Sequence, residues 1–283
     1  MNLIGKTPLV KLGDKLYAKF EAYNQSGSIK DRMASYILQK AEENGDIRKG
    51  YTIVTASSGN TGIAFAMLAA QKGYGCIIIM PENMSEERKQ MMRSFGARII
   101  EVGYNDFKGA IRTRDELVSN FGEYWSPMQF SNPHNIECHY HTTAPEIHQA
   151  LVQLGSVELS ALVSGAGTGG TIMGCQKGLS RIYRGAKFLL TMPAEDAASH
   201  GIQGINDGAD FLVDKSLIDE ELIVSTDDAK QRARQLARTK GLLVGISSGA
   251  NVIAAERWIE KNNPSGVVVT FLCDRGERYL SIL

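Results

Sequence analysis

The sequence predicts an α/β fold in which helices cover both faces of mostly parallel sheets. Three observations lead to this prediction. Short apolar runs alternate along the chain with helical patterns, as in the continuously apolar run 76–80 that Pro81 closes. Glycines such as Gly73 and Gly96 stand where the helical patterns stop. The alternation comes in two series, which predicts two domains.

Each series can be followed in order along the chain. In the first, the turn 58–62 separates the opening strand from its helix, and 123–130 is a strand or a loop. The other expected elements of the first series are strands at 51–57, 76–80 and 97–103 and helices at 63–73, 85–96 and 106–122. The second series has expected strands at 159–165, 186–195 and 265–274 and helices at 170–183, 227–241 and 249–262. Within the second series, residues 193–214 are expected to form a long loop of functional importance.

Composition narrows the class of protein. The 283 residues are 43% hydrophobic and 22% charged, and 31 basic residues balance 31 acidic ones. A net charge of zero gives no reason to expect nucleic acid or an anionic membrane as a partner. No segment approaches the roughly 18 apolar residues of a membrane span, and the first residues lack a signal peptide's apolar stretch. A cytoplasmic location is therefore expected.

Four cysteines and a group of histidines raise the question of a metal site. The cysteines form no C-x-x-C pair and are expected to be buried thiols in a reducing compartment; they are Cys76, Cys138, Cys175 and Cys273. His139 and His141 would face one way on a strand, beside His134 and His148 in the sequence. No acidic or cysteine partner has a convincing spacing, so no metal is expected.

Four small, polar, glycine-rich turns each open a predicted helix. Parallel sheets bind ligands in such turns, at the carboxyl ends of their strands. The turns are "GSIKDR" (27–32), "SSGNTG" (57–62), "GAGTGGT" (165–171) and "GISSGAN" (245–251).

The turn 165–171 is the clearest candidate for a phosphate site, because glycines let backbone N–H groups at a helix start approach an anion. Two alternatives remain open on this motif alone. Gly165, Gly167 and Gly170 satisfy the dinucleotide-binding pattern G-x-G-x-x-G, with Glu195 near the place of a ribose-binding acid. The glycines could also serve only helix–sheet packing.

The turn 57–62 offers a second anion cradle, sized for a small carboxylate. It lacks the lysine of a P-loop, so a nucleoside triphosphate is not expected. The alternative is a simple helix-capping turn.

Lys30 stands at the start of a predicted helix, where the helix dipole disfavours a cation. A neutral amine there would be a nucleophile able to form a Schiff base with a carbonyl cofactor. Taken alone, Lys30 fits better the commoner case of a solvated surface lysine.

Taken together, these stretches resemble the pyridoxal-phosphate (PLP) enzymes of the cysteine synthase and cystathionine β-synthase family, which have PLP fold type II. "NQSGSIKDR" (24–32) is similar to the family's N-P-x-G-S-x-K-D-R motif, with Gln25 in place of proline, and "SSGNTGIA" to T-S-G-N-T-G-I. The resemblance extends to "IGKTPLVKL", "MPENMSEERKQMMRSFGARI", "QFSNPHNIECHYHTTAPEI", "GTGGT", "GISSGA" and "CDRGERYLS". The segment "MPENMSEERKQMMR" and the tail "CDRGERYLS" look most like the B-type cysteine synthase (O-acetylserine sulfhydrylase), although "GIQGI" looks more like the A-type.

The resemblance implies a role for each matched residue. Lys30 would hold PLP as an internal aldimine and act as acid and base on the substrate Cα. Asn60 would bond the 3′-oxygen of the ring, and Ser247 would face the pyridine nitrogen. The 5′-phosphate would be held by Gly167, Thr168, Gly169, Gly170 and Thr171. The amino-acid substrate would be bound by Ser57, Ser58, Gly59, Thr61, Gln129 and Gly204.

The implied fold is two three-layer, doubly wound domains, similar to the tryptophan synthase β subunit. A smaller, mobile domain would span 24–134, and 1–23 with 135–283 would form the larger domain, with the cofactor between them. A dinucleotide site then explains neither Lys30 nor Ser247. The segment 196–203 looks shorter than in A-type enzymes, which leaves substrate choice open.

The implied activity is β-replacement on O-acetyl-L-serine, or O-phosphoserine, with sulfide or a sulfide donor, giving L-cysteine through an aminoacrylate. The alternatives are cystathionine formation, cysteine desulfhydration, diaminopropionate synthesis, or an inactive PLP-fold binding protein. A homodimer is expected, with serine acetyltransferase or a sulfur-carrier protein as further partners.

Overall fold

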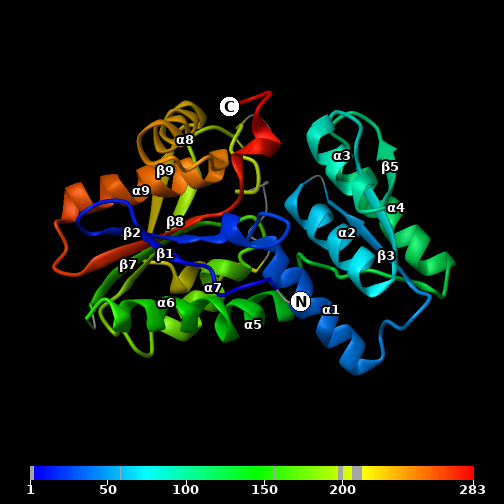
Figure 1. The fold of residues 1–283 in the computed structure, drawn as a ribbon, viewed down its shortest axis with the longest axis horizontal. Coiled ribbons are helices and arrows are strands. Elements are labelled where there is room, and N and C mark those ends of the chain that lie inside the picture. Colours follow the sequence, from blue (N-terminus) through cyan, green and yellow to red (C-terminus); the bar gives the residue numbers. More distant parts are fainter. Residues whose placement is uncertain (1–2, 58, 156, 197–199, 206–211) are drawn as a thin grey trace. The chain divides into compact units, whose positions relative to one another are not determined.

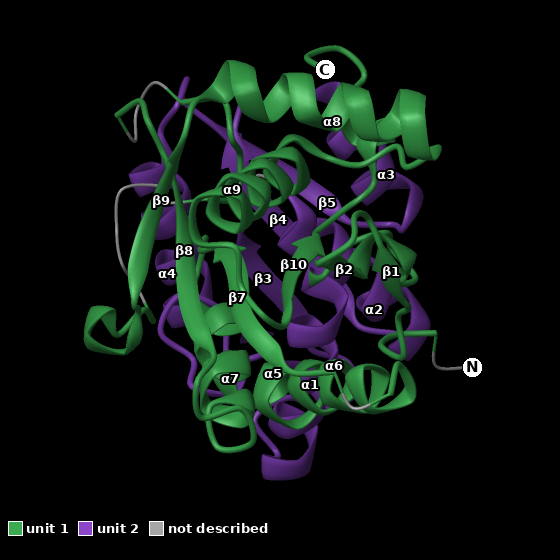
Figure 2. Ribbon diagram, turned by 90° about the vertical axis from the view of Figure 1, so that its left-hand side faces the viewer, with its two compact units in different colours: residues 1–29, 135–283 green, residues 30–134 purple. Residues whose placement is uncertain are grey.

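The computed structural model describes residues 3–57, 59–155, 157–196, 200–205 and 212–283. The chain divides into two compact units, residues 1–29 with 135–283 and residues 30–134 (Figure 2). The smaller unit therefore begins at Lys30, whereas the sequence analysis placed this boundary at residue 24. Residues 24–29 lie in the larger unit because they bond to its C-terminal segment: Ile29 N–H donates to Cys273 O over 2.8 Å, and Arg275 N–H to Gly27 O over 3.0 Å.

The larger unit, whose helices and strands Figure 1 colours along the chain, is built on a six-stranded sheet in the order β1-β2-β10-β7-β8-β9, which can be followed in Figure 2. β1 runs antiparallel to β2, and the other neighbours are parallel. Its strands are β1 (Leu9–Lys11), β2 (Leu16–Phe20), β7 (Leu159–Gly165), β8 (Lys187–Pro193), β9 (Glu220–Val224) and β10 (Val267–Leu272). Its helices are α5 (His134–His141), α6 (Thr143–Gln153), α7 (Gly170–Leu179), α8 (Thr226–Lys240) and α9 (Ile246–Asn262), with short 3₁₀ turns at Glu21–Tyr23, Lys215–Leu217 and Gly276–Tyr279.

The central strands of this sheet are buried on both faces, which makes the unit three-layered. In β10, Val268 and Leu272 pack in the core beneath α8 and α9. Val269 and Phe271 point the other way, into the core beneath α6 and α7. This period of two, with buried residues on both faces, explains why the strand is apolar in the sequence at every position except Thr270, whose hydroxyl donates to Val163 O.

The smaller unit has a four-stranded parallel sheet in the order β5-β4-β3-β6. Its strands are β3 (Thr52–Ala56), β4 (Gly75–Pro81), β5 (Arg98–Val102) and β6 (Tyr124–Trp125), and its helices are α1 (Lys30–Asn44), α2 (Asn60–Lys72), α3 (Glu86–Ser94) and α4 (Phe107–Asn120). α4 covers Val54 and Ile79 on one face. α2 covers the other face, where Gly62 lies against Ile78.

The predicted α/β class with two doubly wound, three-layer domains is confirmed. The details differ in the middle of the chain. Only Tyr124 and Trp125 of the uncertain segment 123–130 form a strand. His139 and His141, considered above as strand neighbours, lie in helix α5 and so do not alternate on a strand. Among the described residues, no helix is both long and apolar enough to cross a membrane.

Candidate active site

The chain leading into Lys30 is fixed by the C-terminal segment 273–278. Ser28 forms a β-bridge with Asp274, and the side chain of Arg278 donates to Ser26 O over 2.8 Å. Gly27 has φ +89°, and a Cβ there would lie 2.7 Å from the Arg278 guanidinium, so this turn requires glycine. Lys30 follows as the first residue of α1, half-buried. The hydrogen bonds and packing of this turn thus fix the position of the Lys30 backbone.

The same C-terminal segment holds the start of α9, where Ser247 lies. Gly245 N–H donates to Asp274 O over 3.1 Å, and Ser248 Oγ accepts the Cys273 N–H over 2.9 Å. Ser247 itself is buried in the first turn of α9. Residues 273–276 therefore anchor both the approach to Lys30 and the predicted pyridine-nitrogen turn, a role that the sequence motif alone does not indicate.

The turn between β7 and α7 approaches other backbone so closely that only glycine fits. A Cβ on Gly167 would lie 2.6 Å from Gly204 O, which also places the predicted substrate residue Gly204 beside this turn. Gly169 has φ +90°, and its Cβ would lie 2.9 Å from the backbone nitrogen of Val213. The turn is thus enclosed by residues 204 and 212–213 of the same unit.

Helix α5 packs against this turn and contacts it with two buried polar side chains. Asn135 donates to Thr168 Oγ1 over 2.9 Å, and its amide oxygen would lie 1.9 Å from a Cβ on Gly170. His139 Nε2 lies 3.2 Å from Thr171 Oγ1, while its Nδ1 lies 2.8 Å from Thr143 Oγ1. With Nε2 protonated, His139 would donate to Thr171 and leave that hydroxyl's proton free for a ligand.

These features fit a phosphate group. The glycines expose backbone at the N-terminus of α7, where the helix dipole favours an anion. The hydroxyls of Thr168 and Thr171 are held in place by α5. Asn135 and His139 were not identified as site residues from the sequence. The signal that could have indicated them is their position within the matched "NPHNIECHYHTTAPEI" stretch.

In the smaller unit, the turn 57–62 joins β3 to α2. Ser57 Oγ accepts the Gly62 N–H over 3.0 Å and approaches the Gly59 N–H at 3.4 Å. Thr61 donates its hydroxyl to Gln129 Oε1 over 2.7 Å, and both side chains are buried. The structure therefore brings together two residues from different motifs, 68 positions apart, that the resemblance assigned to one substrate site. Asn60 is the first residue of α2, and Ser58 lies outside the described residues.

Glu195, which the dinucleotide alternative would place at a ribose, instead accepts a backbone hydrogen bond at a helix start. Its Oε1 accepts the Thr226 N–H over 2.8 Å at the start of α8. This backbone hydrogen bond lowers the pKa of the Glu195 carboxyl. The carboxylate thus acts as a helix-terminus partner.

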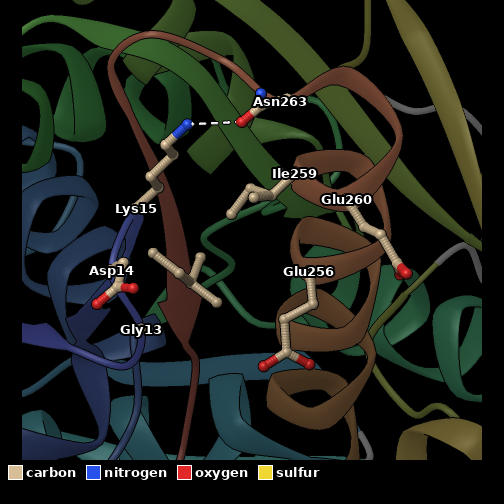
Figure 3. A pocket seen from close by; sticks show the side chains of 8 residues that line it. Gly13, Asp14, Lys15, Glu256, Ile259, Glu260 and Asn263 are labelled. Atoms are coloured by element: carbon tan, nitrogen blue, oxygen red, sulfur yellow. Dashed lines mark hydrogen bonds between the residues drawn. The ribbon is translucent and has the colours of Figure 1, made fainter.

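A shallow surface pocket of about 420 Å³ lies elsewhere in the larger unit, between the β1–β2 turn and α9 (Figure 3). Lys15 reaches across it to Asn263 Oδ1 over 2.8 Å. Glu256 on its wall is bonded to Arg232 by both carboxylate oxygens. None of the predicted site residues lines this pocket.

Comparisons with known proteins give the geometry its context. Residues 1–274 match the family described as pyridoxal-phosphate dependent enzyme. A cysteine synthase from Staphylococcus aureus is 38% identical over 99% of this chain and 94% of its own length. Among solved structures, a hydrogen sulfide-producing enzyme from Fusobacterium nucleatum has a TM-score of 0.93 at 41% identity, covering 99% of this chain and 89% of that one. An O-acetylserine-dependent cystathionine β-synthase from Helicobacter pylori has a TM-score of 0.88 at 34% identity, covering 99% and 95%.

The predicted family, enzyme class and cofactor are confirmed by these matches over essentially the whole described fold. The chain belongs to the pyridoxal-phosphate-dependent enzymes of the cysteine synthase and cystathionine β-synthase family.

Proposed function

We propose that this enzyme makes L-cysteine by β-replacement, with O-acetyl-L-serine or O-phospho-L-serine as donor and sulfide or a sulfide donor as nucleophile. The observation that supports this most strongly is full-length similarity to cysteine synthase, at 38% identity over 99% of the chain. The residues to which the resemblance assigns side-chain chemistry, Lys30, Asn60 and Ser247 among them, have the amine, amide or hydroxyl that the proposed roles need.

Lys30 is proposed to hold the cofactor through its amine. Its place at the N-terminus of α1 favours the neutral amine over the ammonium form. When bound, pyridoxal phosphate supplies an electron sink for negative charge at the substrate Cα. Released from the cofactor, the Lys30 amine would take or return the proton at that carbon.

The two turns of the larger unit are proposed to hold the ends of the cofactor. Gly167–Thr171 would bind its phosphate through backbone N–H groups and two threonine hydroxyls. Ser247 would meet the pyridine nitrogen with a neutral hydroxyl, which leaves that nitrogen largely unprotonated. A milder electron sink favours loss of a β-leaving group over accumulation of negative charge at Cα.

The turn 57–62 is proposed to bind the substrate carboxylate. The N-terminus of α2 and the hydroxyls of Ser57 and Thr61 are suited to a small anion. Asn60 would meet the ring 3′-oxygen, and Gln129 would assist through its bond to Thr61.

The experiment is a two-step product assay on the cofactor-loaded enzyme. O-acetyl-L-serine is added first, then sulfide, while acetate, L-cysteine and the visible absorption of the cofactor are followed. We expect acetate release and a spectral change in the first step, and L-cysteine with return of the original spectrum in the second. Acetate release with no L-cysteine on addition of sulfide would reject the proposal.

A second candidate is the release of sulfide from L-cysteine. The structural neighbour with the TM-score of 0.93 is a hydrogen sulfide-producing enzyme. The same preparation is given L-cysteine alone, and sulfide is measured. If sulfide forms from L-cysteine faster than L-cysteine forms from O-acetyl-L-serine and sulfide, the second candidate replaces the first.

A further inference from the structure

Asn251 is a fully buried amide at the end of the glycine-rich turn 245–251, and the motif assigns it no role. It lies in the second turn of α9, which packs on one face of the sheet against β7 and β10 (Figure 2). Its Oδ1 accepts the Gly165 N–H over 2.7 Å. Its Nδ2 donates to Phe271 O over 3.3 Å and to Cys273 Sγ over 3.4 Å. One side chain therefore bonds to the end of β7 and to the end of β10.

The backbone partners fix the orientation of this amide. The Gly165 N–H can only donate and the Phe271 carbonyl can only accept, so the oxygen of Asn251 meets the first and the nitrogen meets the second. Buried residues farther along α9, such as Ala254 and Ala255, are apolar. A buried amide among them is costly unless its hydrogen bonds are made, and here both its oxygen and its nitrogen are bonded.

The amide lies where β7 and β10 separate. Their parallel pairing runs from Val267 to Val269 on β10, although both strands continue for three residues beyond it, to Gly165 and Leu272. Past the pairing, side chains connect the two strands: Thr270 through its hydroxyl, and then the amide of α9. Parallel sheets bind ligands at such carboxyl ends, where neighbouring strands diverge. Side-chain bonds thus replace strand pairing at the edge where the two cofactor turns are held.

Each end of this connection leads to a proposed cofactor contact. Gly165 is the first residue of the phosphate turn. Cys273 donates its N–H to Ser248 Oγ over 2.9 Å, in the turn that carries Ser247. The amide of Asn251 thus connects the phosphate turn with the segment that anchors the predicted pyridine-nitrogen turn.

We propose that Asn251 is a positioning residue that sets the spacing between these two turns, so that one cofactor molecule engages both. This rests on the proposed roles of Gly167–Thr171 and Ser247. A phosphate group adds its full affinity to a bound ring only when its turn is already held at the distance that the ligand spans. Loss of the amide should therefore weaken joint binding more than binding at either turn alone.

The test compares three probes on the apoenzyme: pyridoxal phosphate, pyridoxal, which lacks the phosphate, and inorganic phosphate. Fluorescence titration measures the first two, and phosphorus NMR measures the third. Asn251→Ala should lose about tenfold or more in affinity for pyridoxal phosphate and little for the two smaller probes. Asn262→Ala is the matched control, because this asparagine of α9 donates to Trp258 O of its own helix. It should bind all three probes as the wild type does.

Equal weakening of pyridoxal phosphate and of either smaller probe by Asn251→Ala would overturn the inference, because the amide would then shape one turn only. Unchanged affinity for all three probes would overturn it as well. If Asn251→Ala does not fold, Asn251→Asp serves instead. It keeps an acceptor for the Gly165 N–H and replaces the donor to Phe271 O, so it should weaken pyridoxal phosphate selectively, and equal weakening of all three would contradict the inference.

Failure of the proposed function is distinguishable from failure of this inference. It would appear as a wild type that makes no L-cysteine, while the three affinities and their dependence on Asn251 stay as expected.

Discussion

The phosphate turn 165–171 and the carboxylate turn 57–62 are made of the same parts and are supported differently. Each joins the end of a parallel strand to the N-terminus of a helix. The phosphate turn is enclosed by other segments: three of its glycines have no room for a Cβ, and Asn135 and His139 hold its threonines. Among the described contacts of the carboxylate turn, Ser57 bonds to the turn's own backbone, Thr61 bonds to Gln129, and Met92 of α3 packs against Gly62.

This difference indicates two kinds of binding. A group that stays through every reaction cycle is served by a turn that surrounding side chains preorganise. A group that enters and leaves with each substrate is served by a turn whose hydrogen bonds can be exchanged for bonds to that group. Damage to the phosphate turn should therefore reduce cofactor affinity, and damage to the carboxylate turn should raise KM.

The largest effect is expected from Lys30→Ala, and its loss of turnover is the reference for substitutions in the two turns. Loss of the amine removes the proposed covalent attachment and the proton-transfer group together, so turnover should fall by about 10³-fold or more. Borohydride treatment should fix the cofactor to the wild type and not to the variant, as measured by mass spectrometry. Covalent cofactor retained on the variant would show that another lysine holds it.

The next effect is expected from Gly170→Ala in the phosphate turn. The new methyl group would lie 1.9 Å from the Asn135 amide oxygen, a clash inside a closely packed region. Overpacking of this kind costs about 1–3 kcal/mol, so cofactor affinity should fall by about tenfold or more. Fluorescence titration of the apoenzyme with pyridoxal phosphate measures this.

Gly185→Ala is the matched control, because a Cβ at that loop position meets no heavy atom within 4 Å. It should bind cofactor like the wild type. If Gly170→Ala and Gly185→Ala have equal affinity, the view that the phosphate turn is rigidly enclosed is wrong.

A smaller effect, of a different kind, is expected from Thr61→Val in the carboxylate turn. The substitution removes the hydroxyl bonded to Gln129 and leaves a buried amide oxygen with one contact fewer. A loss of about 0.5–1.5 kcal/mol corresponds to a KM for O-acetyl-L-serine raised by about three- to tenfold. Cofactor affinity should not change.

Thr61→Ser keeps the hydroxyl, so its KM for O-acetyl-L-serine should be close to the wild-type value. A Thr61→Val enzyme that loses cofactor as readily as Gly170→Ala would contradict the division of labour between the two turns. Steady-state kinetics and cofactor titration on the same preparations separate these outcomes.

The sequence could predict the repeating elements and the turns because both are local. Apolar runs such as 76–80 report a strand buried on two faces, and glycines at 167, 169 and 170 report close backbone approach. The order of matched motifs then identified the family, its fold and its cofactor. The residue-by-residue roles stay predictions.

The supports of the turns could not be predicted in the same way. Asn135 lies 33 positions from Thr168, and Asn251 lies 86 from Gly165, so only tertiary packing brings these pairs together. Local periodicity shows which face of an element is buried but not which element covers it. His139 illustrates the limit: a spacing that suits a metal site on a strand belongs to a helix, where the ring contacts two threonines.

The smallest effect is expected from a thiol reagent acting on the cysteines, which lie outside both turns. Cys76, Cys138 and Cys175 are buried, and burial raises the pKa of Cys76 to about 12. The thiolate is the reactive form, so near pH 8 only about one Cys76 in 10⁴ is reactive even before access is considered. A thiol reagent should therefore modify the folded protein at Cys273, the one partly exposed cysteine, and reach the other three only on unfolding. Peptide mass mapping before and after denaturant measures this, and rapid labelling of Cys76 in the folded enzyme would mean that β4 opens on the timescale of the reaction.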